Sequence, residues 1–323
     1  MLVKDRSKSL RIKKLEVFQR RLIQNHPKLL TISDELGGRL AGHHGEQSND
    51  YFLKPFLSKG YSVLHDLRLA ANDSFFQLDT LLLSTRYILI LEVKYITGTL
   101  HFDHLNQVIR IRDDGTEEAF QNPIFQVKRQ RSHLTDWLSK NRVPNIPIHS
   151  LVVMSNPRTI IKSLPSHKDV LQYVTHSPYL QERIQVFDKM NSVEKLTKKE
   201  ITKLSKMLVR HHTPDNPDLL KRYQIEEKDI IKGVYCTECF YMPVVRKNRT
   251  WVCAKCSNED RNLHIPTLED YVLLYGTRIT NKQFCDFLQL QSRHVANRLL
   301  RSMNLDLSGS GKGRYYHLPC PSK

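Results

Sequence analysis

The sequence contains no stretch of the roughly eighteen consecutive apolar residues that a helix needs to cross a bilayer. Its opening residues, Met1 to Arg6, reach charged side chains before the apolar centre of a signal peptide could form. We therefore expect a cytoplasmic protein with no membrane partner. The 323 residues, 40% of them hydrophobic, suffice for two or three modest domains with buried cores.

Cysteine is scarce, with six residues in the whole chain. Four of them stand as two Cys-x-x-Cys pairs, whereas Cys285 and Cys320 are isolated. This arrangement fits a reducing compartment and a metal site better than a disulfide framework.

Acidic residues are in deficit, because 33 Asp and Glu stand against 50 Lys and Arg and the formal net charge is +17. The excess of basic residues is not confined to a short tail, since residues 191–323 carry 23 basic and 14 acidic side chains of the 50 and 33 in the whole chain. A surface of this charge attracts polyanions by Coulomb steering and counterion release, which favours nucleic acid as the partner. Charge alone leaves open a basic protein that binds nothing specific.

Apolar periodicity predicts the order helix, antiparallel strands, helix, strand. Residues 8–30 are basic and weakly helical, and the glycines within 33–44 predict a loop before a short amphipathic helix at 46–58. Asn122 and Pro123 predict the start of a later helix, because asparagine caps helices and proline suits the first turn. The expected strands are 61–69, 75–83, 87–93, 98–102, 107–112 and 148–154.

Charged residues end the most apolar of these strands. Glu92 and Lys94 project from one face of it, because side chains alternate along a strand, and Ile88 to Leu91 mark it as buried. A hairpin at 84–86 places Asp79 roughly opposite Leu91 and Glu92, so two carboxylates and one ammonium meet at the sheet edge. Such carboxylates suit Mg²⁺ or Mn²⁺, and a lysine beside them can position or deprotonate a water. The alternative is an ordinary salt-bridged pair on a solvated face.

Several short motifs, in the right order, resemble the nuclease-related domain (NERD) family, which is grouped with the restriction-endonuclease-like PD-(D/E)xK superfamily. The motifs are Gly45-Glu46, Gln77-Leu78-Asp79, Ile90-Leu91-Glu92-Val93-Lys94 followed by Gly98, and Phe120-Gln121-Asn122-Pro123 followed by Gln126. Leu78 departs from the proline of the namesake motif, which members of the superfamily often lack.

The resemblance implies an α/β fold with a central mixed sheet flanked by helices. It also assigns the site residues: Asp79 and Glu92 hold Mg²⁺ or Mn²⁺, Lys94 serves the attacking water, Glu46 adds a carboxylate from the first helix, and Gln126 lines the site. Two of these residues also have plainer interpretations. Glu46 suits the dipole of a first helical turn, and Gln126 suits a solvent-facing helix position.

The paired cysteines are Cys236 with Cys239 and Cys253 with Cys256, and thirteen residues separate the pairs. Thiolates at this spacing enclose a tetrahedral Zn²⁺ on two knuckles joined by a hairpin, whose turn is expected at 246–249. A closed set of four thiolates leaves no position for water, so this zinc is expected to be structural. Four unrelated free cysteines, or a redox pair, are the alternatives.

The last sixty residues or so predict a helix-turn-helix with a wing. Helix starts are expected at Thr267 with Asp270, at Thr280 with Gln283, and at Ser292. The helix after Ser292 has a predicted apolar stripe of Val295, Leu299 and Met303. Its opposite face and the glycine-rich segment that follows supply candidate nucleic-acid contacts: His294, Asn297, Arg298, Arg301, Lys312 and Arg314. The alternative is a plain helical cap with a solvated basic face.

Together these features favour a metal-dependent nuclease that a zinc ribbon and a winged-helix-like module deliver to DNA rather than RNA. The alternative is a catalytically silent regulator or adaptor that uses the same modules to bind nucleic acid. The expected division is a basic helical extension (1–40), a nuclease-like domain (41–185), a helical linker (186–230), a zinc ribbon (231–262) and a winged-helix-like module (263–323).

Overall fold

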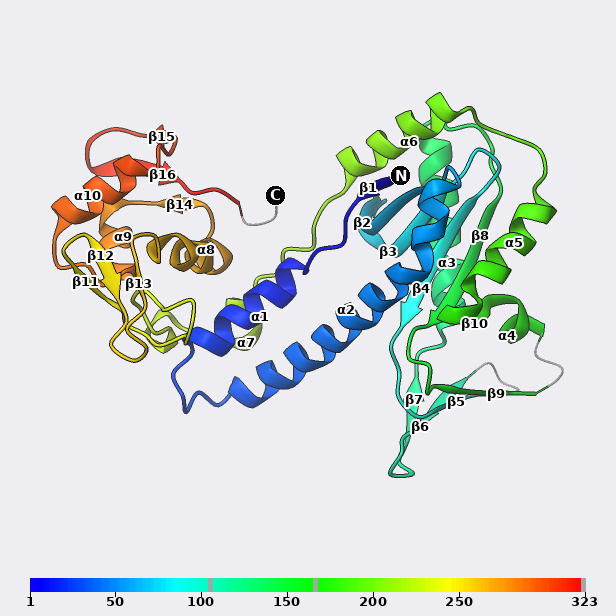
Figure 1. Cartoon of the computed structure of the whole chain (residues 1–323), viewed down its shortest axis with the longest axis horizontal. Helices are drawn as coiled ribbons and strands as arrows, with labels where there is room; N and C mark the ends of the chain where they lie inside the picture. Colours follow the sequence, from blue (N-terminus) through cyan, green and yellow to red (C-terminus); the bar gives the residue numbers. More distant parts are fainter. Residues whose placement is uncertain (104–106, 165–167, 321–323) are drawn as a thin grey trace. The chain divides into compact units, whose positions relative to one another are not determined.

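The computed structural model describes residues 1–103, 107–164 and 168–320, apart from the side chain of Lys312. This part of the chain forms two compact units (Figure 1). Unit 1 comprises Met1–Lys8 and Arg39–Pro214, and unit 2 comprises Ser9–Gly38 and Asp215–Lys323. The five-part division expected from the sequence stays a prediction. Among the described residues, no helix combines the length and the apolar character needed to cross a membrane.

Unit 1 is built on a mixed six-stranded sheet with the strand order β1-β2-β3-β4-β8-β10. The pairs β2–β3 and β3–β4 are antiparallel, whereas β1–β2, β4–β8 and β8–β10 are parallel. The strands are β1 (Leu2–Lys4), β2 (Ser62–Ala71), β3 (Ser74–Leu83), β4 (Ile88–Lys94), β8 (Ile148–Met154) and β10 (Val174–His176). The three strands predicted between residues 61 and 93 and the strand at 148–154 are thereby confirmed.

Helices cover both faces of this sheet. On one face, α3 (Pro123–Lys140) and α6 (Lys198–His211) pack apolar side chains against Ile88 and Ile90 of β4. On the other face, the end of α2 (Leu29–Ser58) and α5 (Leu180–Met190) cover Leu89 and Leu91. Burial on both sides explains the nearly continuous Leu and Ile runs in β3 and β4. The predicted α/β class, a central mixed sheet flanked by helices, is confirmed.

Helix α2 corrects one prediction, because it runs without interruption through both the loop expected at 33–44 and the short helix expected at 46–58. A glycine weakens a helix by only about 1 kcal/mol relative to alanine, and burial of side chains along the helix outweighs that cost. Ile32 and Leu36 are buried near its start, and Leu53 and Phe56 near its end. Glu46 therefore lies in the middle of a long helix, not in a first turn.

A second, four-stranded sheet in unit 1 has the order β7-β6-β5-β9 and lies beyond the end of β4 (Figure 1). Its strands are β5 (Thr99–Phe102), β6 (Val108–Ile111), β7 (Glu117–Phe120) and β9 (Ile160–Ser163). The predicted pair at 98–102 and 107–112 corresponds to β5 and β6, while β7 and β9 were not predicted. α4 (Lys168–Tyr173) and the 3-10 turn η1 (Ser177–Tyr179) precede α5.

Unit 2 contains helical, ribbon and winged-helix parts. The helical part comprises α1 (Leu10–Arg21), the start of α2, α7 (Leu219–Tyr223) and the 3-10 turn η2 (Glu227–Asp229). The ribbon has three short strands, β11 (Val245–Lys247), β12 (Thr250–Val252) and β13 (Glu259–Asp260). The last part comprises α8 (His264–Tyr275), β14 (Arg278–Ile279), α9 (Asn281–Phe287), α10 (Arg293–Ser302), β15 (Leu307–Ser308), the 3-10 turn η3 (Gly311–Gly313) and β16 (Tyr315–His317).

The C-terminal part has the predicted winged-helix-like character. A helix-turn-helix formed by α9 and α10 is followed by the hairpin β15–β16, and β14 completes a sheet of order β14-β16-β15. Thr280 and Gln283 form the expected capping box at the start of α9. Ser292 stands at the N-cap of α10, but its side chain makes no capping hydrogen bond.

Two details of this part were predicted wrongly. α8 begins at His264, so Thr267 is inside the helix, where its hydroxyl donates to the carbonyl oxygen of Leu263. The buried stripe of α10 is Ala296, Leu299 and Leu300, rather than Val295, Leu299 and Met303. The predicted stripe follows a single row of residues at four-residue spacing. The buried face also includes residues three positions apart, such as Ala296 and Leu299.

Candidate active site and four-cysteine centre

The strand register brings Asp79 beside Glu92. Thr80 pairs with Leu91, and the Val93 N–H donates to Asp79 Oδ2 at 2.9 Å. Glu92 and Lys94 lie on one face of β4, with Lys94 Nζ 2.6 Å from Glu92 Oε1. The predicted juxtaposition is therefore present. Its place differs from the prediction, because β3 and β4 are the two middle strands of the sheet and not an edge.

Glu92 is a buried carboxylate surrounded by hydrogen-bond donors. Its side chain is 2% exposed, which excludes a salt bridge on a solvated face. Oε1 accepts from Lys94 Nζ and from Gln126 Nε2 at 2.5 Å, and Oε2 accepts from Gln130 Nε2 at 2.6 Å. The side-chain oxygen of Gln126, Oε1, accepts a further hydrogen bond from Lys94 Nζ at 3.0 Å. Gln126 thus faces the site and not the solvent alone.

The start of α3 places both glutamines. Asn122 caps the helix by accepting from the Ile124 N–H, and Pro123 occupies the first turn, as predicted. Gln126 and Gln130 are one turn apart and therefore share a face, which is directed at β4. Gln130 was not predicted, although its four-residue spacing from Gln126 was a usable signal.

Glu46 approaches these carboxylates from α2. Burial, together with the negative charges of Asp66, Glu92 and Asp50, raises the pKa of Glu46 to about 7 against the opposing effect of Arg6. Burial and the charges of Glu92 and Glu46 likewise raise the pKa of Asp79 well above its usual value. The three predicted carboxylates are thus close enough to repel one another.

Gly45 allows α2 to come this close. A Cβ atom at Gly45 would lie 2.4 Å from Tyr95 Cβ and 2.8 Å from Ser155 Oγ, next to the ends of β4 and β8. We predict that Gly45→Ala lowers the free energy of unfolding by about 1–3 kcal/mol, because overpacking outweighs the gain in helix propensity. Gly42→Ala in the same helix meets nothing within 4 Å and should stabilise the protein slightly. Urea unfolding of both variants checks this, and equal stability would refute the close approach.

A second acidic group, not predicted, adjoins the first. Arg6 forms salt bridges with Glu46, Asp50 and Asp66, and its guanidinium also contacts His65 and Thr80. Each contact spans at least 40 residues of sequence. No local pattern could have indicated them.

The donor set of Asp79, Glu92 and Glu46 fits a hard divalent cation. Carboxylate oxygens are the preferred ligands of Mg²⁺ and Mn²⁺, and a cation would offset the burial and the mutual repulsion that raise the pKa of Asp79 and Glu46. Burial opposes the charge of Lys94, but the charges of Glu92 and Asp79 outweigh burial and raise the pKa of Lys94. In the described part of the chain the carboxylate oxygens do not converge as closely as the cysteine sulfurs.

The four paired cysteines gather at one point in unit 2. Their sulfur atoms all lie within 4.8 Å of one another, with Cys236 Sγ 3.5 Å from Cys256 Sγ and Cys239 Sγ 3.6 Å from Cys253 Sγ. A Zn–S distance of about 2.3 Å sets sulfur atoms about 3.8 Å apart in a tetrahedron. Burial opposes a thiolate at Cys236, but the Cys239 and Glu238 N–H groups outweigh it and lower the pKa of Cys236 to about 6. The cluster can hold a metal ion.

A hairpin joins the two cysteine pairs, as predicted. β11 and β12 are connected by Asn248 and Arg249, both with positive φ, which suits a tight turn of two residues. Trp251 on β12 is 1% exposed, whereas Phe240 is 59% exposed. Trp251 therefore packs in the ribbon, and Phe240 faces solvent.

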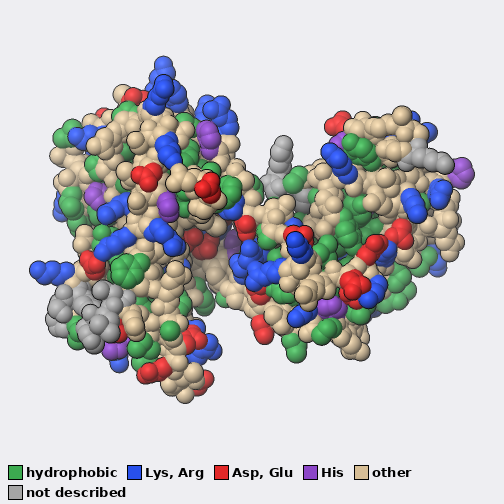
Figure 2. Space-filling view, turned by 180° about the vertical axis from the view of Figure 1, so that it is seen from behind, with side chains coloured by type: hydrophobic (Ala, Val, Ile, Leu, Met, Phe, Trp, Pro, Cys, Tyr) green, Lys and Arg blue, Asp and Glu red, His purple; other side chains and the backbone are tan. Residues whose placement is uncertain are grey.

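The candidate nucleic-acid residues lie on the surface of unit 2. His294, Asn297, Arg298, Arg301 and Arg314 are exposed, while the side chain of Lys312 lies outside the described part of the structure. Partial burial and the nearby Arg298 guanidinium lower the pKa of Arg246 on β11, so a basic residue of the ribbon lies near α10. Lys and Arg side chains also occur over the visible face of both units (Figure 2).

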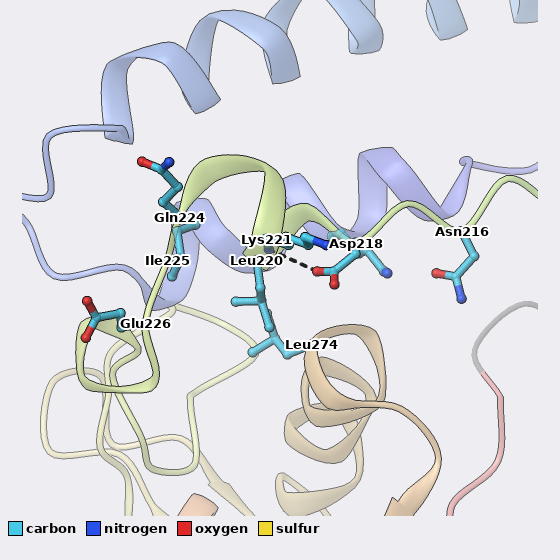
Figure 3. A pocket seen from close by; sticks show the side chains of 9 residues that line it. Asn216, Asp218, Leu220, Lys221, Gln224, Ile225, Glu226 and Leu274 are labelled. Carbon is cyan, nitrogen blue, oxygen red and sulfur yellow. Dashed lines mark hydrogen bonds between the residues drawn. The ribbon is translucent and has the colours of Figure 1, made fainter.

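A pocket of about 600 Å³ in unit 2 is a different feature (Figure 3). Residues between Asn216 and Glu226 line most of it, with Lys14 and Leu274. Its carboxylate Asp218 already caps α7 by accepting from the Lys221 N–H at 3.0 Å. None of the carboxylates, the lysine or the glutamines of the candidate site in unit 1 lines this pocket, and we do not assign the chemistry to it.

A mixed sheet with helices on both faces, and with acidic, lysine and glutamine side chains on its middle strands and α3, defines a nuclease-like α/β core. The comparison with known families agrees: residues 41–155 match the nuclease-related domain, which confirms the resemblance seen in the sequence. The match includes Glu46, Asp79, Glu92, Lys94 and Gln126 and stops short of the four cysteines. No curated protein and no solved structure matches the chain.

Proposed function

We propose that this protein is a metal-dependent nuclease that binds DNA and hydrolyses its phosphodiester bonds. The observation that carries the proposal is the buried Glu92 carboxylate, held between Asp79, Lys94 and two glutamines within a nuclease-related domain. A protein that only grips a polyanion gains nothing from buried carboxylates that face it. A metal-dependent nuclease needs them, because they hold the divalent cation beside the scissile phosphate.

Each residue has a separable role in this proposal. Asp79 and Glu92 hold Mg²⁺ or Mn²⁺, and Glu46 contributes a third carboxylate. The bound cation would polarise the phosphate and make the attacking water more acidic. Lys94 donates hydrogen bonds to that water and offsets negative charge at phosphorus, while Gln126 and Gln130 fix the orientation of Glu92.

Unit 2 is proposed to deliver the enzyme to DNA. The four cysteines hold a structural Zn²⁺. The exposed face of α10 contacts DNA through His294, Asn297, Arg298 and Arg301, with Arg314 on the phosphate backbone. The proximity of Arg246 to Arg298 and the net charge of +17 support this assignment.

The test is incubation of the purified protein with single-stranded, duplex and nicked DNA, and with RNA, in Mg²⁺ or Mn²⁺. Asp79→Asn, Glu92→Gln and Lys94→Ala should each lower the cleavage rate by about 10³-fold or more, because losing a metal ligand or the charge beside the phosphate removes several kcal/mol of transition-state stabilisation. Matched changes on the exposed face of α5, Glu182→Gln and Lys189→Ala, should leave the rate unchanged.

Two results would count against the proposal. Equal cleavage by the wild type and by all three site variants would mean a contaminating nuclease and would refute the assigned site. Tight, salt-sensitive binding without cleavage by any form would instead favour the silent regulator. Faster cleavage of RNA than of DNA would correct the substrate class alone.

A further inference from the structure

Arg6 reaches the candidate active site from the first residues of the chain. Segment 1–8 belongs to unit 1, where β1 pairs in parallel with β2. Lys4 Nζ anchors the same segment by donating to the His65 carbonyl at 2.8 Å. Residues 9–38 then belong to unit 2, and the chain re-enters unit 1 along α2, which carries Glu46 and Asp50. Arg6 therefore links residues 1–8 to the part of unit 1 that begins at Arg39, although the thirty residues 9–38 separate these segments in the sequence.

All five N–H groups of the Arg6 guanidinium have acceptors. Nε and Nη2 bind the two oxygens of Asp50 at 2.9 and 3.0 Å, in the forked geometry that arginine prefers. Nη1 donates to Glu46 Oε2 at 2.5 Å and to Asp66 Oδ1 at 3.1 Å. The remaining Nη2 hydrogen faces Thr80 Oγ1 and His65 Nδ1 at 3.0 and 2.9 Å. The side chain is 2% exposed, so Arg6 has no free donor for a substrate phosphate.

The charges around this guanidinium resemble those of a site for two cations. Five carboxylates lie in the two adjoining groups, namely Glu46, Asp50, Asp66, Asp79 and Glu92. Arg6 and Lys94 neutralise two of them, which leaves a formal charge of −3 when all are ionised. One divalent cation brings this to −1, whereas without Arg6 the same cation would leave −2. Loss of Arg6 should therefore leave enough negative charge to bind a second divalent cation.

We propose that Arg6 is a positioning residue, the permanent counter-cation of the Glu46, Asp50 and Asp66 group, and that it restricts the active site to one divalent metal ion at Asp79 and Glu92. By holding Glu46 at 2.5 Å, it also fixes the third carboxylate next to that ion. The inference rests on the proposed metal site, but its central residue, Arg6, precedes the nuclease-related match, which begins at residue 41.

The test counts metal ions rather than activity. Mn²⁺ binding to the full-length, zinc-loaded protein is measured by calorimetry and by the electron paramagnetic resonance of free Mn²⁺. The wild type should bind one Mn²⁺ and Arg6→Gln two. Arg6→Lys, which keeps the positive charge, should bind one, and so should the triple variant Arg6→Gln, Asp50→Asn, Asp66→Asn. Arg158→Gln, a change at an exposed arginine of the same unit, should behave as the wild type.

The outcomes separate this inference from the proposed function. A wild type that binds no Mn²⁺ would contradict the metal site itself. A wild type and an Arg6→Gln variant that both bind one Mn²⁺ would contradict only the role of Arg6. If Arg6→Gln unfolds, recovery of the fold in millimolar Mn²⁺ would support replacement of the guanidinium by a metal ion. An Arg6→Gln chain that stays unfolded in Mn²⁺ would overturn the inference.

Discussion

Removal of zinc with a strong chelator is expected to unfold the ribbon of unit 2 and leave the sheet of unit 1 intact. The three ribbon strands have only two or three residues each, too few to bury a sufficient apolar core. Structural zinc contributes on the order of 10–16 kcal/mol in small zinc-binding peptides, so the ribbon should depend on its metal for folding. DNA binding should weaken too, because the ribbon hairpin carries Arg246 beside α10.

The two tryptophans of the chain separate the responses of the two units. Trp251 is buried in the ribbon, and Trp137 is buried on α3 in unit 1. In a Trp137→Phe variant, chelation should shift the fluorescence of Trp251 to longer wavelength, and added Zn²⁺ should reverse the shift. In a Trp251→Phe variant the emission should stay constant. Cys253→Ser should reproduce the chelated state, whereas Cys285→Ser should not. An unchanged Trp251 signal in fully metal-free protein would refute a structural zinc.

The parts of the site that the sequence predicted are those set by short-range geometry. A hairpin of fixed length places Asp79 beside Glu92, and strand alternation places Glu92 and Lys94 on one face. The start of α3 follows from Asn122 and Pro123, and Gln126 comes one turn later. Metal-ligand spacing likewise predicts the cysteine cluster, because two Cys-x-x-Cys knuckles joined by a hairpin can bring four sulfur atoms together.

The parts that were missed depend on contacts between distant segments. Arg6 meets Asp66 across 60 residues and Glu46 across 40, and nothing in the local composition distinguishes it from the other basic residues. The course of α2 was also not predicted, since Gly37, Gly38 and Gly42 suggest a loop until burial of both helix ends is known. Gly45 is an example of a residue whose role depends on distant segments, because its lack of a side chain permits close packing of α2 against Tyr95 and Ser155.

Asp270→Asn is expected to destabilise unit 2 by about 3–5 kcal/mol, because it leaves a buried positive charge without a counter-ion. Arg21 is 0% exposed, and its Nε donates to Asp270 Oδ2 at 2.6 Å across 249 residues of sequence. Arg20 holds the other carboxylate oxygen, also at 2.6 Å. The basic pair at the end of α1 thus binds a buried carboxylate of unit 2. Urea unfolding followed by Trp251 fluorescence in a Trp137→Phe background measures the change.

A double variant tests why Asp270→Asn lowers stability. The cause is either the loss of the ion pair or the burial of an arginine that keeps its charge without a counter-ion. Arg21 also donates to the Ile231 and Gly233 carbonyls and lies 4.7 Å from the Phe287 ring centroid, in largely apolar surroundings. Arg21→Met combined with Asp270→Leu should therefore recover most of the loss, since well-packed apolar replacements of buried ion pairs are often neutral. Glu269→Gln, at the exposed neighbouring position, should cost less than about 0.5 kcal/mol. A double variant as unstable as Asp270→Asn would show that the pair itself stabilises the contact of α1 with α8.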